Sequence, residues 1–76
     1  MTRLGIAGLG WLGESLIKDV PRLAGLEVVA VQDVRPGRPR EIADRYGAPW
    51  SGESFDELLE PIREIRYQRV SVVITF

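Results

Sequence analysis

The sequence predicts an α/β fold built on a parallel sheet of three to four strands with three helices. Two nearly continuous apolar runs, 4–9 and 26–31, have the pattern of strands that are covered on both faces. A segment with helical spacing of apolar residues follows the first run, and parallel strands need such a crossover. The alternation of strands and helices therefore indicates a doubly wound sheet, of which 76 residues make only part.

The first half of the chain alternates between strand and helix. Pro21 is expected to bring the first helix near its end, before the strand at 26–31. Pro39 suits the first turn of a second helix, which runs to Tyr46 and is terminated by Gly47. The expected apolar face of the first helix consists of Leu12, Leu16, Ile17 and Val20.

The second half is expected to hold a short strand, a helix and a last strand. Residues 48–51 form a short strand at most, and Ser54 and Glu57 have the spacing of a capping box that starts the third helix. Pro61 is expected to interrupt or restart this helix. Residues 70–74 are the last strand candidate, whose apolar edge suits pairing with a second copy of the chain. The buried face of the third helix is expected to be Phe55, Leu58 and Leu59.

Composition and charge remove several classes of function. A formal net charge of −1 gives no bulk attraction to nucleic acid or to an anionic membrane. No apolar run approaches the ~18 residues of a membrane span. Cys and His are both absent, which excludes disulfides, Cys/His zinc sites and His-based acid–base catalysis. We therefore expect a cytoplasmic protein without a metal site and without a nucleic-acid or membrane partner.

A Gly-x-Gly-x-x-Gly turn follows the first strand, at Gly8, Gly10 and Gly13. In dinucleotide-binding units the first glycine makes the tight turn, the second lets the pyrophosphate approach the backbone, and the third lets the helix pack closely on the strand. The N–H groups of Trp11 and Leu12 would then face the phosphates from the positive end of the helix dipole. The alternative is a glycine-rich turn that serves packing alone.

Asp33 follows the last glycine of this turn by 20 positions, at the end of the second strand. A carboxylate at this place accepts hydrogen bonds from both hydroxyls of an adenosine ribose, which favours NAD. Its alternative role is to cap the following turn. Arg35 and Arg38 lie close enough in the sequence to bind the 2′-phosphate of NADP, unless both are merely solvated. The Trp11 side chain is expected to cover the cofactor or to pack against a neighbouring helix or a second domain.

Four segments stand in the order and spacing of a known family: Arg-Leu-Gly-Ile-Ala-Gly-Leu-Gly at 3–10, Leu-Glu-Val-Val-Ala-Val-Gln-Asp at 26–33, Ala-Asp-Arg-Tyr-Gly at 43–47 and Ser-Phe-Asp-Glu-Leu-Leu at 54–59. With them, residues 1–59 resemble the N-terminal Rossmann domain of the glucose-fructose oxidoreductase, inositol dehydrogenase and MocA (Gfo/Idh/MocA) family. The resemblance implies NAD or NADP binding and hydride transfer to or from sugars, cyclitols or related alcohols. It also implies the cofactor contacts Gly8, Gly10, Trp11, Leu12, Gly13 and Asp33, and, with a shift of one residue, Thr75.

The family's catalytic lysine lies in a Glu-Lys-Pro motif after later strands, and it has no counterpart in this sequence. Lys18, on the first helix, cannot replace it. We therefore expect residues 1–76 to be a single, truncated NAD(P)-binding Rossmann-like domain without its substrate domain, which binds a dinucleotide at most and catalyses no reaction alone. Two alternatives are a non-enzymatic nucleotide-sensing or protein-interaction module and, less favoured, a fragment of an S-adenosylmethionine-binding methyltransferase.

Overall fold

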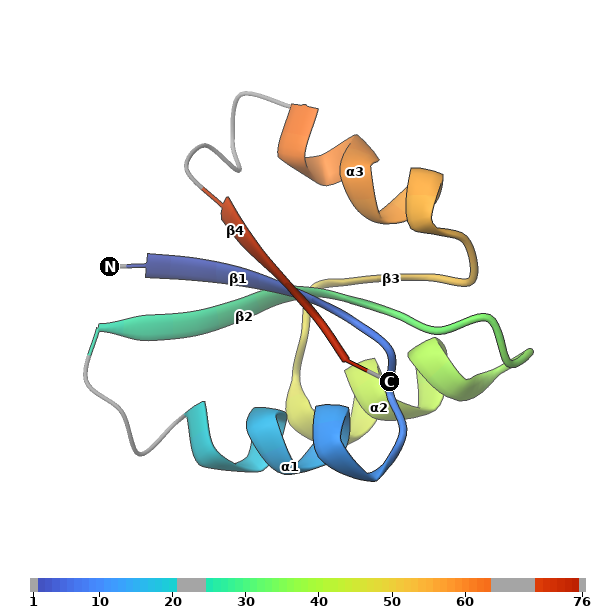
Figure 1. The fold of residues 1–76 in the computed structure, drawn as a ribbon, viewed down its shortest axis with the longest axis horizontal. Coiled ribbons are helices and arrows are strands. Elements are labelled where there is room, and N and C mark those ends of the chain that lie inside the picture. Colours follow the sequence, from blue (N-terminus) through green and yellow to red (C-terminus); the bar gives the residue numbers. More distant parts are fainter. Residues whose placement is uncertain (1, 21–24, 64–69, 76) are drawn as a thin grey trace.

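In a computed structural model that describes residues 2–20, 25–63 and 70–75, four strands and three helices alternate along the chain (Figure 1). All strands are parallel, in the order β3-β2-β1-β4. The expected α/β class, a Rossmann-like parallel sheet with three helices, is confirmed. Within the same ranges, no helix combines the length and the apolar character needed to cross a membrane. The elements are β1 (Thr2–Ala7), α1 (Trp11–Asp19), β2 (Leu26–Gln32), α2 (Arg38–Tyr46), β3 (Trp50–Gly52), α3 (Phe55–Arg63) and β4 (Val70–Ile74).

The helices cover both faces of the sheet. Figure 1 shows α1 and α2 on one face and α3 on the other. Neighbouring residues of a strand point to opposite faces, so Ile6 belongs to the core beneath α1 and α2, whereas Ala7 belongs to the core beneath α3. This explains why the strands have continuous apolar runs. The first core contains Ile6, Leu9, Ile17, Val31, Ile42 and Ala43, and the second contains Ala7, Val29, Ala30 and Leu58.

Several element boundaries differ from the expected ones, and β3, at Trp50–Gly52, begins and ends later than the expected 48–51. β1 ends at Ala7 and not at Leu9, because Gly8 has a φ of +95° and turns the chain out of the sheet. The third helix is not interrupted at Pro61 but continues to Arg63. A proline removes one hydrogen bond from a helix and does not by itself forbid the next turn.

The predicted apolar face of α1 is wrong in one residue, Leu12. Leu12 is 46% exposed, whereas Ile17 and Val20 are buried. The buried stripe begins at Gly13, from which Ile17 and Val20 follow at i+4 and i+7, and Leu12 lies one residue away from that stripe. α1 ends at Asp19, in agreement with the expected end near Pro21, although Pro21 itself lies outside the described residues.

The carboxyl ends of β1, β2 and β4 meet at one end of the sheet. β2, the next strand along the chain, pairs with one side of β1, and β4 pairs with the other side. Ligand crevices of open α/β sheets lie at such a reversal of strand order. Ala7 is in register with both Gln32 and Ile74. The residues that follow these three therefore emerge next to one another: Gly8, Asp33 and Thr75.

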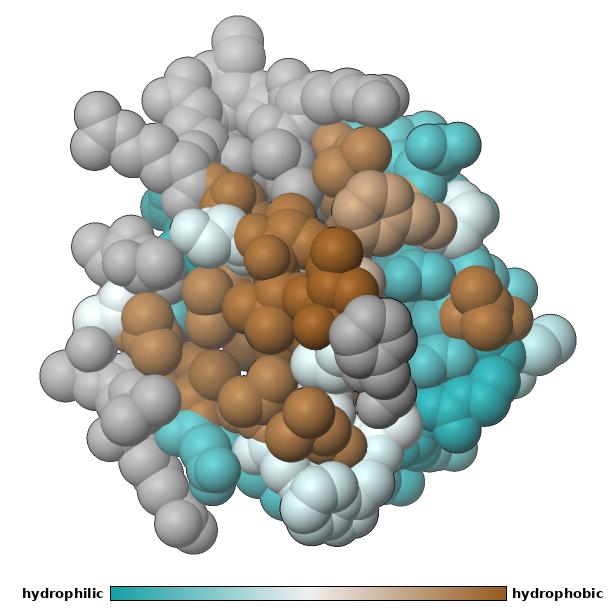
Figure 2. All heavy atoms as spheres, viewed as in Figure 1, coloured by the Kyte–Doolittle hydropathy of each residue, from teal (hydrophilic) through white to brown (hydrophobic). Residues whose placement is uncertain are grey.

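β4 is an edge strand with an apolar surface. Figure 2 shows apolar residues gathered where Figure 1 places β4. Val72 and Val73 are half-buried, and Ile74 is 60% exposed. Among the described residues, β4 pairs with β1 alone. Self-association of two chains through this edge stays a prediction.

Candidate functional site

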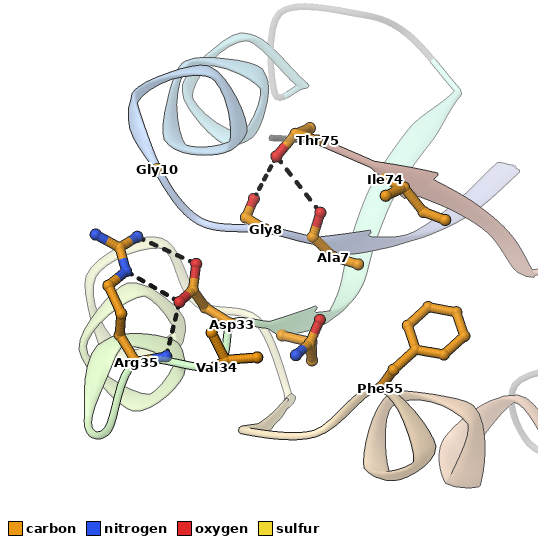
Figure 3. A pocket seen from close by; sticks show the side chains of 10 residues that line it. Ala7, Gly8, Gly10, Asp33, Val34, Arg35, Phe55, Ile74 and Thr75 are labelled. Atoms are coloured by element: carbon orange, nitrogen blue, oxygen red, sulfur yellow. Dashed lines mark hydrogen bonds and ion pairs between the residues drawn. The ribbon is translucent and has the colours of Figure 1, made fainter.

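A groove of about 560 Å³ lies at the carboxyl ends of β1, β2 and β4 (Figure 3). Five of the expected site residues line it, whereas Trp11, Leu12, Gly13 and Arg38 do not. Ligand sites commonly combine such a concave, largely apolar lining with a few polar groups. The lining residues are Ala7, Gly8, Gly10, Gln32, Asp33, Val34, Arg35, Phe55, Ile74 and Thr75.

The three glycines of the turn have different surroundings. A Cβ on Gly13 would collide with the carbonyl oxygen of Gly8, and a Cβ on Gly8 would lie 2.5 Å from the carbonyl oxygen of Thr75. A Cβ on Gly10, by contrast, would meet no atom within 4 Å. Gly13 thus lets α1 pack on the end of β1, and Gly8 makes the tight turn, as expected from the motif. The approach of a pyrophosphate to Gly10 stays a prediction.

Gly10 is also the N-cap residue of α1 and, as a glycine, has no side chain to cap this helix. The N–H groups in the first turn of a helix have no partner within the helix, and the helix dipole makes this end positive. The N–H groups of Trp11 and Leu12 belong to that first turn. The Trp11 side chain is 84% exposed, so the expected packing against a neighbouring helix does not occur in the described part of the chain.

Asp33 is buried at the end of β2, and its carboxylate accepts four hydrogen bonds. Oδ2 accepts from the N–H of Leu9 at 2.7 Å, and Oδ1 accepts from the N–H of Arg35 at 2.8 Å. The Arg35 guanidinium donates the other two, from Nε to Oδ1 at 3.0 Å and from Nη2 to Oδ2 at 3.1 Å (Figure 3). These bonds, above all those of Arg35, hold the pKa of Asp33 well below its usual range. Asp33 therefore caps the turn after β2 and also holds the glycine turn in place.

Arg38 connects the glycine turn to α2. Its Nε donates to the carbonyl oxygen of Leu9 at 2.9 Å, and its Nη2 donates to Glu14 Oε1 at 2.9 Å. Glu14 also accepts hydrogen bonds from Arg45 Nη1 and from the Tyr46 hydroxyl, each at 2.7 Å. Arg38 is therefore not merely solvated, and its binding of a 2′-phosphate stays a prediction.

The contacts of Glu14 make the fold sensitive to acid. Hydrogen bonds from Tyr46, Arg38 and Arg45 lower the pKa of Glu14 from 4.5 to about 2. Because the pKa is depressed in the folded state, Glu14 stabilises the fold above pH 4.5, and this contribution is lost as the pH falls toward about 2. Glu14→Gln is expected to be less stable than wild type at neutral pH and to lose less stability on acidification, as measured by urea unfolding at several pH values.

Glu27→Gln is a matched control for this experiment, because it removes an exposed carboxylate from β2. It is expected to retain the acid sensitivity of the wild type. An equally steep pH dependence in Glu14→Gln and in the wild type would contradict the role assigned to Glu14.

Thr75 closes the groove between β1 and β4. Its N–H donates to the carbonyl oxygen of Ala7 at 2.8 Å, and its hydroxyl donates to the carbonyl oxygen of Gly8 at 2.7 Å. Thr75 thereby holds the residue after β4 against the glycine turn. It lines the groove, and its contact with a cofactor stays a prediction.

Five lining residues were missed by the sequence analysis: Ala7, Gln32, Val34, Phe55 and Ile74. Phe55 was expected on the buried face of α3, where Leu58 is fully buried, but Phe55 is 44% exposed at the groove. The available signal was its position directly after the capping residue Ser54, whose hydroxyl accepts the N–H of Glu57 at 3.1 Å. Gln32 and Ile74 end β2 and β4, so only the strand order brings them together.

The fold and the groove define an α/β protein with a Rossmann-like sheet and a crevice at its switch point. No model of a known protein family matches the chain. Over 57 residues, or 75% of its length, the chain is 32% identical to 4-carboxy-2-hydroxymuconate-6-semialdehyde dehydrogenase of Sphingobium sp. (strain NBRC 103272 / SYK-6). The match spans 18% of that protein. The chain is thus similar to part of an oxidoreductase, which agrees with the general expectation but does not establish the Gfo/Idh/MocA family.

Proposed function

We propose that the chain is the dinucleotide-binding part of a nicotinamide-dependent dehydrogenase. The observation that carries this proposal is the contrast among the glycines, because Gly8 and Gly13 are closely packed whereas the Gly10 backbone is open to the groove. A side chain at residue 10 would fill this space, and its absence leaves room for a pyrophosphate beside the first N–H groups of α1.

The residues around the groove fit the parts of such a cofactor. In the proposal, the N–H groups of Trp11 and Leu12 bind the pyrophosphate, and the region of Asp33 binds the adenosine ribose. Phe55 and Ile74 supply apolar walls. The bound nicotinamide supplies hydride chemistry, while this chain binds and orients the cofactor.

The groove offers little for catalysis of its own. In the described part of the chain, its polar side chains are Gln32, Asp33, Arg35 and Thr75. The lowered pKa of Asp33 keeps its carboxylate ionised at neutral pH, so Asp33 has no proton to donate there. We therefore assign cofactor binding and no turnover to this chain alone.

A finer proposal concerns the whole enzyme to which such a part belongs. The resemblance to the Gfo/Idh/MocA family supports hydride transfer to or from sugars, cyclitols or related alcohols. The similar Sphingobium protein is by name a semialdehyde dehydrogenase, so aldehydes belong among the substrates to be assayed. This similarity also favours a dehydrogenase over the methyltransferase alternative.

Titration of the chain with NADH and NADPH tests the proposal. Trp11 lies next to Gly10 and is exposed, so bound reduced nicotinamide is expected to quench tryptophan emission and to fluoresce by energy transfer. At least one of the two dinucleotides is expected to bind saturably, and calorimetry gives an independent affinity. Failure of both to bind would refute the proposal. Saturable binding of S-adenosylmethionine alone would instead support the methyltransferase alternative.

A further inference from the structure

Arg35 occupies the position on Asp33 that a ribose would use. A carboxylate offers about four lone-pair sites for hydrogen bonds. The N–H groups of Leu9 and Arg35 use two of them, and Nε and Nη2 of the Arg35 guanidinium use the other two. A ribose hydroxyl therefore finds no vacant acceptor site on Asp33 unless the guanidinium moves away.

The backbone contacts of Asp33 are fixed by the fold, but the guanidinium contacts are not. Leu9 is fully buried and belongs to the glycine turn, so its N–H bond to Asp33 is part of the architecture. The Arg35 side chain, by contrast, is 55% exposed, and Arg35 lies in the segment between β2 and α2. Arg35 is thus the partner of Asp33 that a ligand can displace.

Arg35 also provides what a 2′-phosphate requires. Its two bonds to Asp33 use two of the five N–H groups of a guanidinium, so further donors remain for a phosphate. A planar guanidinium binds phosphate oxygens in pairs, and such charge-assisted bonds are among the strongest in proteins. Its positive charge also offsets the repulsion between Asp33 and a 2′-phosphate.

Arg38, the other candidate for binding the 2′-phosphate, already bonds to other groups. Its guanidinium bonds to the carbonyl oxygen of Leu9, to Glu14 and to Glu41, and its side chain is 20% exposed. It does not line the groove. Of the two arginines, the structure brings Arg35 alone to the lining, at the end away from Phe55 (Figure 3).

We propose that Arg35 makes the groove prefer NADPH over NADH, because it competes with the ribose hydroxyls for Asp33 and binds the 2′-phosphate itself. This inference rests on the proposed dinucleotide binding. The inference reverses the preference for NAD that Asp33 alone suggests, because Asp33 is available to the ribose only when the Arg35 guanidinium has moved away.

The ratio of the two dissociation constants, for NADH and for NADPH, tests the inference. The wild type is expected to bind NADPH about tenfold more tightly than NADH, which corresponds to one charge-assisted hydrogen bond. Arg35→Gln is expected to weaken NADPH binding and to strengthen NADH binding, because Asp33 becomes available to the ribose. The ratio should therefore fall about tenfold or more.

Arg40→Gln is the matched control, since it removes the same charge from an exposed residue of α2 that pairs only with Asp44 among the described residues. Its ratio is expected to equal that of the wild type. If the wild type binds NADH but the ratio is the same in Arg35→Gln, or also changes in Arg40→Gln, the inference fails while the proposed function stands. If the wild type binds neither dinucleotide, both fail.

Discussion

Replacing Gly13 with alanine is expected to destabilise the fold by about 3 kcal/mol, the upper end of the usual cost of overpacking. The added Cβ would collide with the carbonyl oxygen of Gly8, which is backbone and cannot rotate away like a side chain. The Gly8 carbonyl oxygen also accepts a hydrogen bond from the Thr75 hydroxyl, and the Gly8 N–H donates to the carbonyl oxygen of Gln32 at 2.7 Å. A shift of Gly8 would thus disturb the junction of three strands.

Urea unfolding followed by circular dichroism measures this effect. A chain of this size is only marginally stable, so a loss of about 3 kcal/mol is expected to leave a large unfolded fraction without denaturant. Gly5→Ala is the matched control, because its Cβ would lie 3.5 Å from Cδ1 of Leu58, an ordinary contact distance. A Gly13→Ala protein as stable as the Gly5→Ala protein would show that α1 can move away from β1.

The sequence was sufficient to predict the fold because its signals are local and agree with one another. Apolar runs marked β1 and β2, and the capping box at Ser54 and Glu57 marked the start of α3. The glycine spacing predicted the packing at Gly8 and Gly13, since the tightest approach at each position is to a backbone carbonyl oxygen. Such features need no knowledge of distant side chains.

The contacts of the arginines could not be predicted in this way. Arg35 bonds to Asp33, only two positions away in the sequence. That its guanidinium takes this partner rather than another depends on where the folded chain places it in the groove. Arg38 reaches Leu9 and Glu14, which lie 29 and 24 positions away and come near only when α1 packs beside α2. Long, charged side chains find partners in the folded arrangement, and composition and periodicity do not specify them.

Replacing Gly10 with aspartate is expected to separate cofactor binding from folding. Gly10 has an extended backbone, with φ of −75° and ψ of −159°, and it is the N-cap of α1. Aspartate is favoured at this position, where its carboxylate caps free N–H groups and complements the helix dipole. Because a Cβ there meets no atom within 4 Å, the variant is expected to be at least as stable as the wild type.

The same carboxylate would occupy the phosphate position and repel a pyrophosphate. Unfavourable contact between like charges costs several kcal/mol, so the affinity for the better-bound dinucleotide is expected to fall by about 100-fold or more. Gly10→Asn is the matched control, because asparagine caps a helix as well and adds similar volume without the charge. Asparagine is expected to weaken binding less than aspartate does, and the difference between the two variants measures the contribution of charge. If Gly10→Asp binds the dinucleotide as tightly as the wild type, the pyrophosphate does not lie at the start of α1. The open space beside the Gly10 backbone would then not be explained by pyrophosphate binding.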